Sequence, residues 1–358
     1  MHRPILHLVL LSILVCLSWA RAEQLIKVGV ITDLSGPATF YGQGTRLGVQ
    51  LAERELNSAG KQVKVIFEDS ALNTQRGLSA AQKLLFIDKV DALMVDFTVI
   101  AVAVSKVAEN NKTLLLYSAA AESVARSNPY AFKSYSDYSL GCEALAKEFL
   151  KRGVQKIGLL KAEAEYGELC EAGLRKVEIE VFEAIYRQGD IVSTQVLAMK
   201  RQGVGAIINA GFEGDMINTL RAANTLDFRV PVGGTEDSFS KVLLEQFKGR
   251  LEGSILFGSR PGSPDLLARF NKLNNSKDSP SYQAAILGYL HARQIFRAIE
   301  SCAERKIGCI VSAMLASRPE PELGFFGWKN KIARLEAVVS EYGKGGFKAV
   351  GSYIEDEG

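Results

Sequence analysis

Few side chains in this sequence could carry out catalysis. Histidine is the most frequent general base in enzymes, and the histidines here are His2, His7 and His291. The first two lie in the N-terminal leader described below, so a Ser-His-Asp triad would have to use His291. That residue lies in LGYLHARQIF, which has helical spacing, and no GxSxG nucleophile motif occurs in the chain. We therefore interpret His291 as a packed or half-exposed helix residue.

Metal and cofactor motifs give no stronger signal. No pair of cysteines or histidines has the spacing of zinc ligands. The glycine-rich segment YGQGTRLG (41–48) misses the GxGxxG register of dinucleotide-binding loops and starts seven residues after the nearest predicted strand. Paired carboxylates carry no argument in a chain with 40 acidic residues. The sequence predicts a protein that is not an enzyme and needs no cofactor or metal.

Composition predicts a folded protein, and length predicts that it has two lobes. It has 358 residues, of which 47% are hydrophobic and 23% charged, and a formal net charge of +3. A disordered or collagen-like chain would be less apolar or more repetitive. Nucleic-acid binding would need a dense basic face, and the sequence has no run of Lys or Arg. The length is about twice that of a typical domain, so we expect two cores.

The first 22 residues have the features of a cleaved signal peptide. A basic start with Arg3 is followed by an apolar run from 5 to 19 and by the small-x-small site Ala20–Ala22. A membrane anchor is the alternative, but the run is shorter than the roughly 20 residues that span a bilayer. Lipidation at Cys16 is weakly supported, because Val15 precedes it. No other stretch is long and apolar enough to cross a membrane, so we expect a soluble protein exported to the periplasm.

Export to an oxidising compartment allows the remaining cysteines to pair. Cys302 and Cys309 flank a short polar stretch between two helical patterns, and a disulfide there would stabilise by about 2 kcal/mol in the chain-entropy model. Cys142 and Cys170 fall on separate predicted helices, and the sequence leaves open whether they meet. Free buried thiols are the alternative for all four.

Strands and helices alternate along the first half of the chain. LIKVGVITDL (25–34) is an apolar, β-branched run of the kind buried in parallel sheets, and apolar spacing over 45–56 predicts a helix. The pattern continues with strands at 63–69, 91–97 and 113–118 and helices near 74–87 and 101–110. This alternation indicates an α/β layer architecture with a parallel sheet.

A second series of the same kind begins after residue 137. It predicts helices at 140–151, 167–179, 193–202 and 215–226, and strands at 156–162, 180–186, 205–212, 229–234 and 253–259. Further helices are predicted near 264–274, 282–303 and 309–317, and the tail (337–354) has two alternating strands around a KGG turn. Ligands of such sheets lie beyond the carboxyl ends of the strands, so two facing sheets would form a cleft between them.

Several long segments resemble one known family. They are IKVGVITDLSGPATFYGQGTRLGVQLAERELNSAG (26–60), FEDSALNTQRGLSAAQKLL (67–85), NPYAFKSYSDYSLGCEALAKEFLKRGVQKIGLL (128–160), AEYGELCEAGL (164–174) and GKGGFKAVG (343–351). In this order they resemble the branched-chain amino-acid (Leu/Ile/Val) binding proteins, which are type I periplasmic solute-binding proteins of ABC importers. The likeness covers nearly the whole chain after the leader.

The resemblance implies a Venus-flytrap fold, with two Rossmann-like lobes, parallel central sheets and a three-segment hinge. The N-terminal lobe would comprise 23–134 plus 258–328, and the C-terminal lobe 135–257 plus 329–358. It also implies capture of a small solute by lobe closure and delivery to an ABC permease in the membrane, by a protein acting as a monomer. Closure follows because a ligand shifts an open–closed equilibrium by its differential affinity for the two states.

The family's pocket can be carried over position by position. Tyr41 and Tyr166 match aromatic residues that pack on the ligand, Phe212 matches another, and Glu236 matches the acid that pairs with the ligand amine. Thr98 matches a Ser that grips the ligand carboxylate. The remaining matches form a small-residue loop whose backbone approaches the ligand, namely Ser118, Ala119, Ala120 and Ala121. Packing or helix capping is the alternative role for each residue taken singly.

Glu122 departs from the family's pattern, which has a Thr that helps to hold the α-carboxylate. Two carboxylates 4 Å apart repel by about 4 kcal/mol at an effective dielectric constant near 20. Either Glu122 points to solvent, or the ligand is not an ordinary α-amino acid. In the second case Glu236 and Asp96 would suit an amine, amide or amidine.

Three classes of function therefore stay open: a transport binding protein, a ligand sensor of the same fold and a secreted enzyme. The first is the preferred interpretation. Nothing in the fold separates delivery from signalling, and the single histidine outside the leader disfavours the enzyme.

Overall fold

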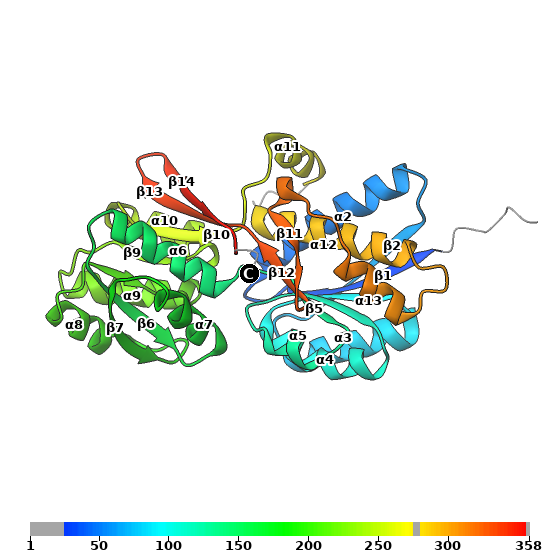
Figure 1. Ribbon diagram of the computed structural model, residues 1–358, viewed down its shortest axis with the longest axis horizontal. Coiled ribbons are helices and arrows are strands. Elements are labelled where there is room, and N and C mark those ends of the chain that lie inside the picture. Colours follow the sequence, from blue (N-terminus) through cyan, green and yellow to red (C-terminus); the bar gives the residue numbers. More distant parts are fainter. Residues whose placement is uncertain (1–24, 275–279, 356–358) are drawn as a thin grey trace, which may run out of the picture.

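The computed structural model describes residues 25–274 and 280–355, and the predicted signal peptide (1–22) lies outside them. The described chain forms two α/β lobes side by side (Figure 1). Each lobe is built on a sheet of seven mostly parallel strands, which confirms the predicted fold class. No helix in the described part of the chain is long and apolar enough to span a bilayer.

The first sheet has the strand order β11-β12-β5-β4-β3-β1-β2. Its strands β1 to β5 pair in parallel, and β12 pairs in parallel with β5, while the edge strand β11 runs antiparallel to β12. The strands are β1 (Ile26–Thr32), β2 (Val63–Asp69), β3 (Ala92–Asp96), β4 (Leu114–Ser118), β5 (Ala131–Lys133), β11 (Phe325–Lys329) and β12 (Ile332–Leu335).

Helices cover both faces of this sheet. The long helices α2 (Thr39–Ser58) and α12 (Tyr282–Glu300) pack together on one face. The other face carries α3 (Thr74–Gln82), its π-helical extension η2 (Lys83–Asp88), α4 (Thr98–Asn110) and α5 (Ser123–Ser127), as Figure 1 shows. The lobe is completed by α11 (Pro264–Leu273), α13 (Ile307–Leu315) and η5 (Pro321–Leu323).

The glycine-rich segment at 41–48 has a packing role. Gly44 and Gly48 lie on α2 where it crosses α12, and an added Cβ would come within 2.2 Å of the Ser281 carbonyl oxygen and within 1.9 Å of the Ala285 carbonyl oxygen. Only glycine permits the two helix backbones to approach so closely. The segment is therefore a helix contact in this structure.

The second sheet has the strand order β14-β13-β10-β9-β8-β6-β7, parallel except at β13 and β14. Alternating residues face opposite helix layers. A Cβ at Gly233 would meet Phe149 of helix α6 (Tyr138–Lys151), and one at Gly234 would meet Met216 of helix α9 (Glu213–Thr225). The strands are β6 (Lys156–Ala162), β7 (Glu180–Tyr186), β8 (Ala206–Ile208), β9 (Val232–Thr235), β10 (Ile255–Gly258), β13 (Ala337–Gly343) and β14 (Gly346–Tyr353).

The helices of the second lobe include one cross-linked pair. They are α6 (Tyr138–Lys151), α7 (Glu165–Leu174), α8 (Ser193–Arg201), α9 (Glu213–Thr225), η3 (Glu236–Ser238), α10 (Lys241–Phe247) and η4 (Lys248–Arg250). A disulfide between Cys142 and Cys170 joins α6 to α7, which answers the question that the sequence left open. The expected disulfide between Cys302 and Cys309 is present in the first lobe.

The chain passes between the lobes after β5, after β10 and after β12. The last crossing corrects one predicted boundary, because the sequence assigned 329–358 to the C-terminal lobe. β12 lies in the first sheet, where the Lys133 N–H donates to the Lys331 carbonyl oxygen. The first lobe therefore continues to Leu335, and the segment that joins the second sheet begins at Ala337.

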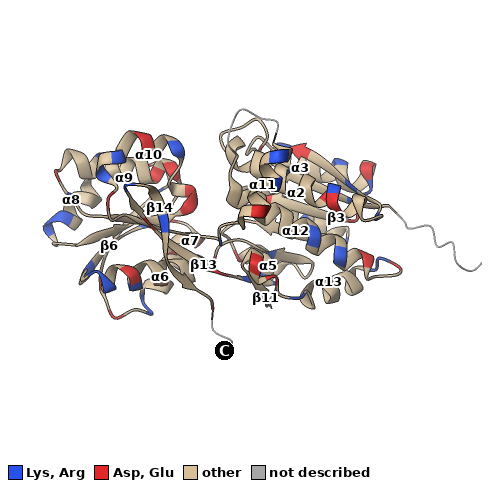
Figure 2. Ribbon diagram, turned by 90° about the horizontal axis from the view of Figure 1, so that it is seen from above, with Lys and Arg blue, Asp and Glu red and all other residues tan. Residues whose placement is uncertain are grey.

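Charged residues of both signs are interspersed over the helices of the two lobes, as Figure 2 shows. No continuous basic face is seen in that view. The arrangement agrees with the near-balance of acidic and basic residues in the sequence.

Candidate functional site

The carboxyl ends of the central strands bring polar side chains from both lobes to the region between the sheets. β1 ends at Thr32, β3 at Asp96 and β4 at Ser118, while β9 of the second sheet leads directly into Glu236 and Asp237. Parallel strands end at one edge of their sheet. A hydrogen bond from the Tyr135 hydroxyl to the Asp237 carboxylate ties the crossing after β5 to the second lobe.

The first lobe contributes a hydrogen-bonded wall. The Thr32 hydroxyl donates to the Asp96 carboxylate at 2.6 Å, and the hydroxyls of Tyr41 and Ser118 are hydrogen-bonded at 2.9 Å. The Tyr41 ring packs on Phe97 with a centroid distance of 5.4 Å. Phe97 has φ of +71°, a left-handed conformation that is rare for a bulky residue and that tends to occur at functional sites. Burial raises the pKa of Asp96 to about 6.

The second lobe contributes two consecutive acids. Burial and the neighbouring charge of Asp237 raise the pKa of Glu236 to about 8, although a hydrogen bond from the Ser259 N–H opposes that change. Burial also raises the pKa of Asp237, and the hydrogen bond from Tyr135 opposes it. The Glu236 carboxylate lies against Gly258, where an added Cβ would come within 2.2 Å of it. A side chain at 258 would therefore displace the carboxylate from this position.

The two walls are close enough to interact electrostatically. Burial raises the pKa of Tyr41 well above its ordinary value, and so do the charges of Asp96 from its own lobe and of Asp237 and Glu236 from the other. Tyr41 therefore lies within reach of acids on both sheets. The site spans the two lobes.

Aromatic rings line the second lobe beside these acids. Tyr138 packs on Tyr166 at 5.7 Å and edge-on against Phe257 at 5.6 Å, and Tyr166 contacts Phe212 at 5.5 Å. Phe212 precedes α9 and is 36% exposed. The buried Tyr138 hydroxyl makes no hydrogen bond of ordinary geometry with any described residue. Such groups are rare in folded proteins and are candidates to bind something else.

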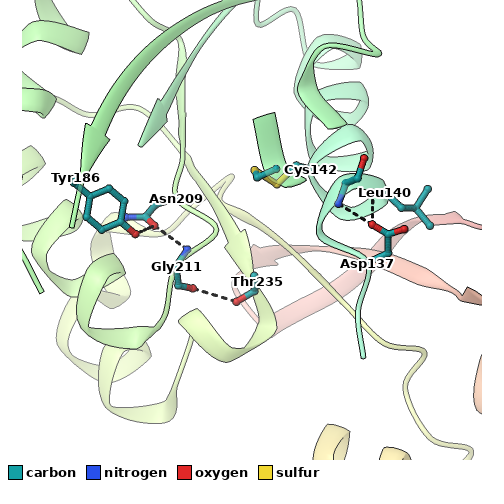
Figure 3. Close-up of a disulfide and its surroundings, with 9 residues drawn as sticks. Asp137, Leu140, Cys142, Tyr186, Asn209, Gly211 and Thr235 are labelled. Atoms are coloured by element: carbon teal, nitrogen blue, oxygen red, sulfur yellow. Dashed lines mark hydrogen bonds between the residues drawn. A yellow bond between two sulfur atoms is a disulfide. The ribbon is translucent and has the colours of Figure 1, made fainter. Parts of the chain in front are cut away.

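A hydrogen-bond network fixes the loop that carries Phe212. The Asn209 side-chain oxygen accepts from the Tyr186 hydroxyl at 3.0 Å and from the Gly211 N–H at 2.9 Å (Figure 3). The Thr235 hydroxyl is 3.4 Å from the Gly211 carbonyl oxygen, which it can donate to. The ends of β8 and β9 are thereby held together.

The small-residue loop after β4 is buried. Ser118 reaches Tyr41, and Ala119, Ala120 and Ala121 are each at most 5% exposed. The Tyr117 hydroxyl donates to the Ala121 carbonyl oxygen at 2.9 Å and holds the loop. Thr98 is the first residue of α4 and partly buried, and Phe97 rather than Thr98 occupies the cap position of that helix.

The side chain of Glu122 does not point to solvent, which was the first of the two alternatives that the sequence left open. Its side chain is buried and forms ion pairs with Arg126 and with the fully buried Lys133, whose Nζ lies 3.7 Å from Oε1. It lines a cavity of about 600 Å³ between α5, the start of α6 and the β11–β12 hairpin. Glu122 is thus neither exposed to solvent nor grouped with Glu236.

The backbone at Glu122 makes a contact between the lobes. Glu165, at the start of α7, accepts hydrogen bonds at Oε1 from the N–H groups of Glu122 (2.8 Å) and Ser123 (3.1 Å). Its Oε2 accepts from the Ser123 hydroxyl at 2.9 Å. One carboxylate of the second lobe therefore occupies the donors at the start of α5 in the first.

His291 is fully packed in α12. Its Nε2 is 2.7 Å from the Ser134 hydroxyl, and burial lowers its pKa to about 3. It therefore stays neutral at physiological pH, as expected for a core residue. Within the described ranges, no three His, Cys, Asp or Glu residues are arranged to hold a metal ion.

Sequence reasoning did not identify Asp237, Tyr135 or Tyr138 as site residues. Asp237 directly follows the predicted Glu236, and its position at a strand end was a usable signal. Tyr135 and Tyr138 lie in the segment where the chain leaves the first lobe, and only the folded arrangement brings them to Asp237.

Comparison with known families and sequences gives consistent results. The sequence model of the family described as "Periplasmic binding protein" matches residues 25–318. The Leu/Ile/Val-binding protein homolog 7 of Brucella suis is 26% identical over 248 residues, with 61% of this chain and 60% of that protein covered. A leucine-, isoleucine-, valine-, threonine- and alanine-binding protein of Pseudomonas aeruginosa is 22% identical over 353 residues, covering 91% of this chain and 92% of the relative.

Solved structures share the fold at low identity. The leucine-binding protein of Thermotoga maritima aligns with a TM-score of 0.79 and 18% identity, over 92% of this chain and 98% of that one. A solute-binding protein of an ABC transporter from R. palustris, in complex with 4-hydroxybenzoate, aligns with a TM-score of 0.76 and 18% identity, over 92% and 97%. Similar folds therefore bind chemically different solutes.

Proposed function

Because this chain belongs to the periplasmic binding protein family, we propose that it is the extracytoplasmic solute-binding component of an ABC importer. It captures a small amino-acid-like, amine or amide solute between its lobes and delivers it to a membrane permease. Members of this family are solute-binding proteins and not enzymes. Residence in the periplasm, after removal of residues 1–22, and action as a monomer belong to the same proposal.

One observation carries this proposal, which is the meeting of acids and aromatic rings from both lobes between the two sheets. The charges of Asp237 and Glu236 of the second lobe help to raise the pKa of Tyr41 of the first. The strand ends that face each other are where open α/β sheets bind ligands. A small solute placed there would contact both lobes at once.

The solute contacts follow from this placement. Tyr41, Ser118, Tyr166, Phe212 and Glu236 line the solute, as the sequence suggested. Thr98 and the buried loop of Ala119, Ala120 and Ala121 contribute backbone groups to the solute. Asp96, Tyr135, Tyr138 and Asp237 are added to the set by their contacts in the structure, and Glu122 is withdrawn because it is paired elsewhere.

The mechanism is capture by closure. Among the described residues, three chain crossings and contacts such as those of Glu165 and Tyr135 join the lobes. A solute that touches both walls binds the closed state better than the open one, and so shifts the equilibrium toward closure. The closed form is what the permease recognises.

Native mass spectrometry of the purified protein, followed by small-angle scattering with and without the solute found, tests the proposal. We expect a bound small molecule that is released unchanged, and a smaller radius of gyration when it is present. Chemical conversion of the solute, or a shape that no solute alters, would contradict the proposed function.

A further inference from the structure

The acids of the interlobe site lack cationic partners. Asp96, Glu236 and Asp237 form no ion pair with any residue in the described ranges. Their hydrogen-bond partners are neutral hydroxyls and a backbone N–H, from Thr32, Thr45, Tyr135 and Ser259. Uncompensated buried carboxylates are costly, and proteins normally pair them.

The lack of positive charge matters most for the two acids that follow β9. Glu236 and Asp237 are adjacent in η3, and each charge disfavours ionisation of its neighbour. Tyr41, Tyr135 and Tyr138 face the same pair and add no positive charge. A cation between the acids would let both carboxyls ionise.

The aromatic rings around the acids suit such a cation. Tyr41 and Phe97 pack together on one side, and Tyr138 and Tyr166 on the other. Ring faces attract ammonium and guanidinium groups by about 0.5 to 2 kcal/mol each. The buried Tyr138 hydroxyl lies near Asp237 and close to Tyr135 and Thr235, yet it makes no hydrogen bond of ordinary geometry with any described residue. It points independently to a polar group supplied from outside.

The hydrogen-bond donors and the cation that could bind a solute carboxylate near this site are already engaged by protein groups. The N–H groups of Glu122 and Ser123, at the end of the small-residue loop, already bind the Glu165 carboxylate. Lys133, which follows α5 in the chain, is fully buried and is paired with Glu122. A second negative charge beside Asp96, Glu236 and Asp237 would be repelled.

We propose that the interlobe site selects solutes of net positive charge, which carry an ammonium, amidinium or guanidinium group without a compensating carboxylate. This inference rests on the proposed function and narrows its solute class. The cation lies between Glu236 and Asp237 with the tyrosine rings around it. Asp96 supplies a further negative charge across the site.

Titration calorimetry with two matched pairs of probes tests the charge rule on the unaltered protein. 3-Methylbutylamine is compared with leucine, and agmatine with arginine, because each pair differs only in the carboxylate. We expect each amine to bind about tenfold more tightly than its amino acid, or better. Equal or tighter binding of either amino acid overturns the inference, and so does failure of both amines to bind.

A variant pair locates the effect. Glu236→Gln keeps the size and removes the charge, and we expect it to weaken agmatine binding by about thirtyfold or more. Glu252→Gln is the matched control, because Glu252 is exposed in the second lobe and should leave binding unchanged. Unchanged agmatine binding in Glu236→Gln would overturn the placement of the cation. Thermal melting of both variants verifies that they fold.

Small-angle scattering separates this inference from the proposed function. If leucine closes the lobes and the amines do not, the protein is a solute-binding protein and the charge rule is wrong. If neither class of probe changes the shape and no solute co-purifies, both proposals fail.

Discussion

Glu122 and Glu236 both follow strands at the edge where the two sheets face each other, yet their electrostatic surroundings are opposite. Glu122 is held by Arg126 and Lys133. Glu236 has Asp237 as its nearest charged neighbour and no cation among the described residues. A carboxylate with its cations in place is a structural element, whereas one without them is available to a ligand.

The comparison also shows what folding requires at each place. Around Glu122 the chain supplies opposite charges within a single lobe, so the pairing is present whether or not the lobes close. Around Glu236 the compensating charge is absent from the described chain, and it can come only from a bound proton or from a solute. Functional sites often carry such locally unfavourable arrangements.

The largest expected effect is on binding. Replacing Glu236 with Ala removes the charge that pairs with the solute, and we expect the solute affinity to fall by several kcal/mol, a factor of about a hundred or more. Calorimetry with the co-purified solute measures it. The same substitution at Glu122 should change affinity by less than about threefold, and a larger loss there would break the contrast between the two acids.

The second prediction concerns stability, for which the substitution at Glu122, and not the one at Glu236, should have the larger effect. Glu122→Gln removes the ion-pair partner of the buried Lys133 and leaves only the charges of Asp137 and Glu165 near it, so we expect the free energy of unfolding to fall by about 3 kcal/mol. Glu236→Gln removes an uncompensated charge, so the solute-free protein should be equally stable or more stable. Unfolding midpoints in denaturant compare the two variants at one pH. A destabilised Glu236→Gln would mean that this carboxylate has a cationic partner.

The sequence predicted the architecture because buried strands and amphipathic helices leave periodic patterns. The runs at 25–34 and 113–118 became β1 and β4, and the alternating tail became β13 and β14. β11 and β12 were missed, since they are short and rich in Lys and Gly around the turn at Asn330. Nothing in that local pattern signals that β12 adds to β5, which is formed by residues about 200 positions earlier.

The site could be predicted only in part for a similar reason. Strand-end positions such as Ser118 and Glu236 follow from the predicted topology together with the family resemblance. The hydrogen bond between Tyr135 and Asp237 joins residues 102 positions apart, and it depends on how the lobes meet. The environment of Glu122 depends on a lysine buried at the end of β5, and charged residues at strand ends are ordinarily expected to be exposed.

The third prediction is a pH dependence of cation binding. Protonation of Glu236, whose pKa is about 8, and of Asp96, at about 6, competes with a cation. The charged forms bind, so affinity for agmatine should rise as pH increases from 6 to 8, by at most about tenfold per pH unit for one proton. Tyr41 and Asp237 face Glu236 as well, and neither contributes a positive charge.

Calorimetry in buffers of different ionisation enthalpy adds a second measurement. Binding at pH 7 should release protons, because the cation favours the ionised carboxyls. Affinity that is flat over this range, with no proton release, would mean that Glu236 is already ionised in the free protein and that its surroundings resemble those of Glu122.

The smallest effect is expected at the contact that brings the two regions together. Glu165 accepts three hydrogen bonds from the start of α5 in the other lobe, and Glu165→Gln weakens them without removing every acceptor. A hydrogen bond to a charged group is worth about 1.5 to 3 kcal/mol, so losing the charge should cost about 1 kcal/mol of closure. The solute-free protein should become more open by small-angle scattering, and solute affinity should fall by less than about tenfold. Glu168→Gln, on the same helix and paired with Lys161 inside its own lobe, is the matched control. If both variants behave alike, Glu165 acts only within its lobe, and the backbone at Glu122 would then be free to bind a solute carboxylate.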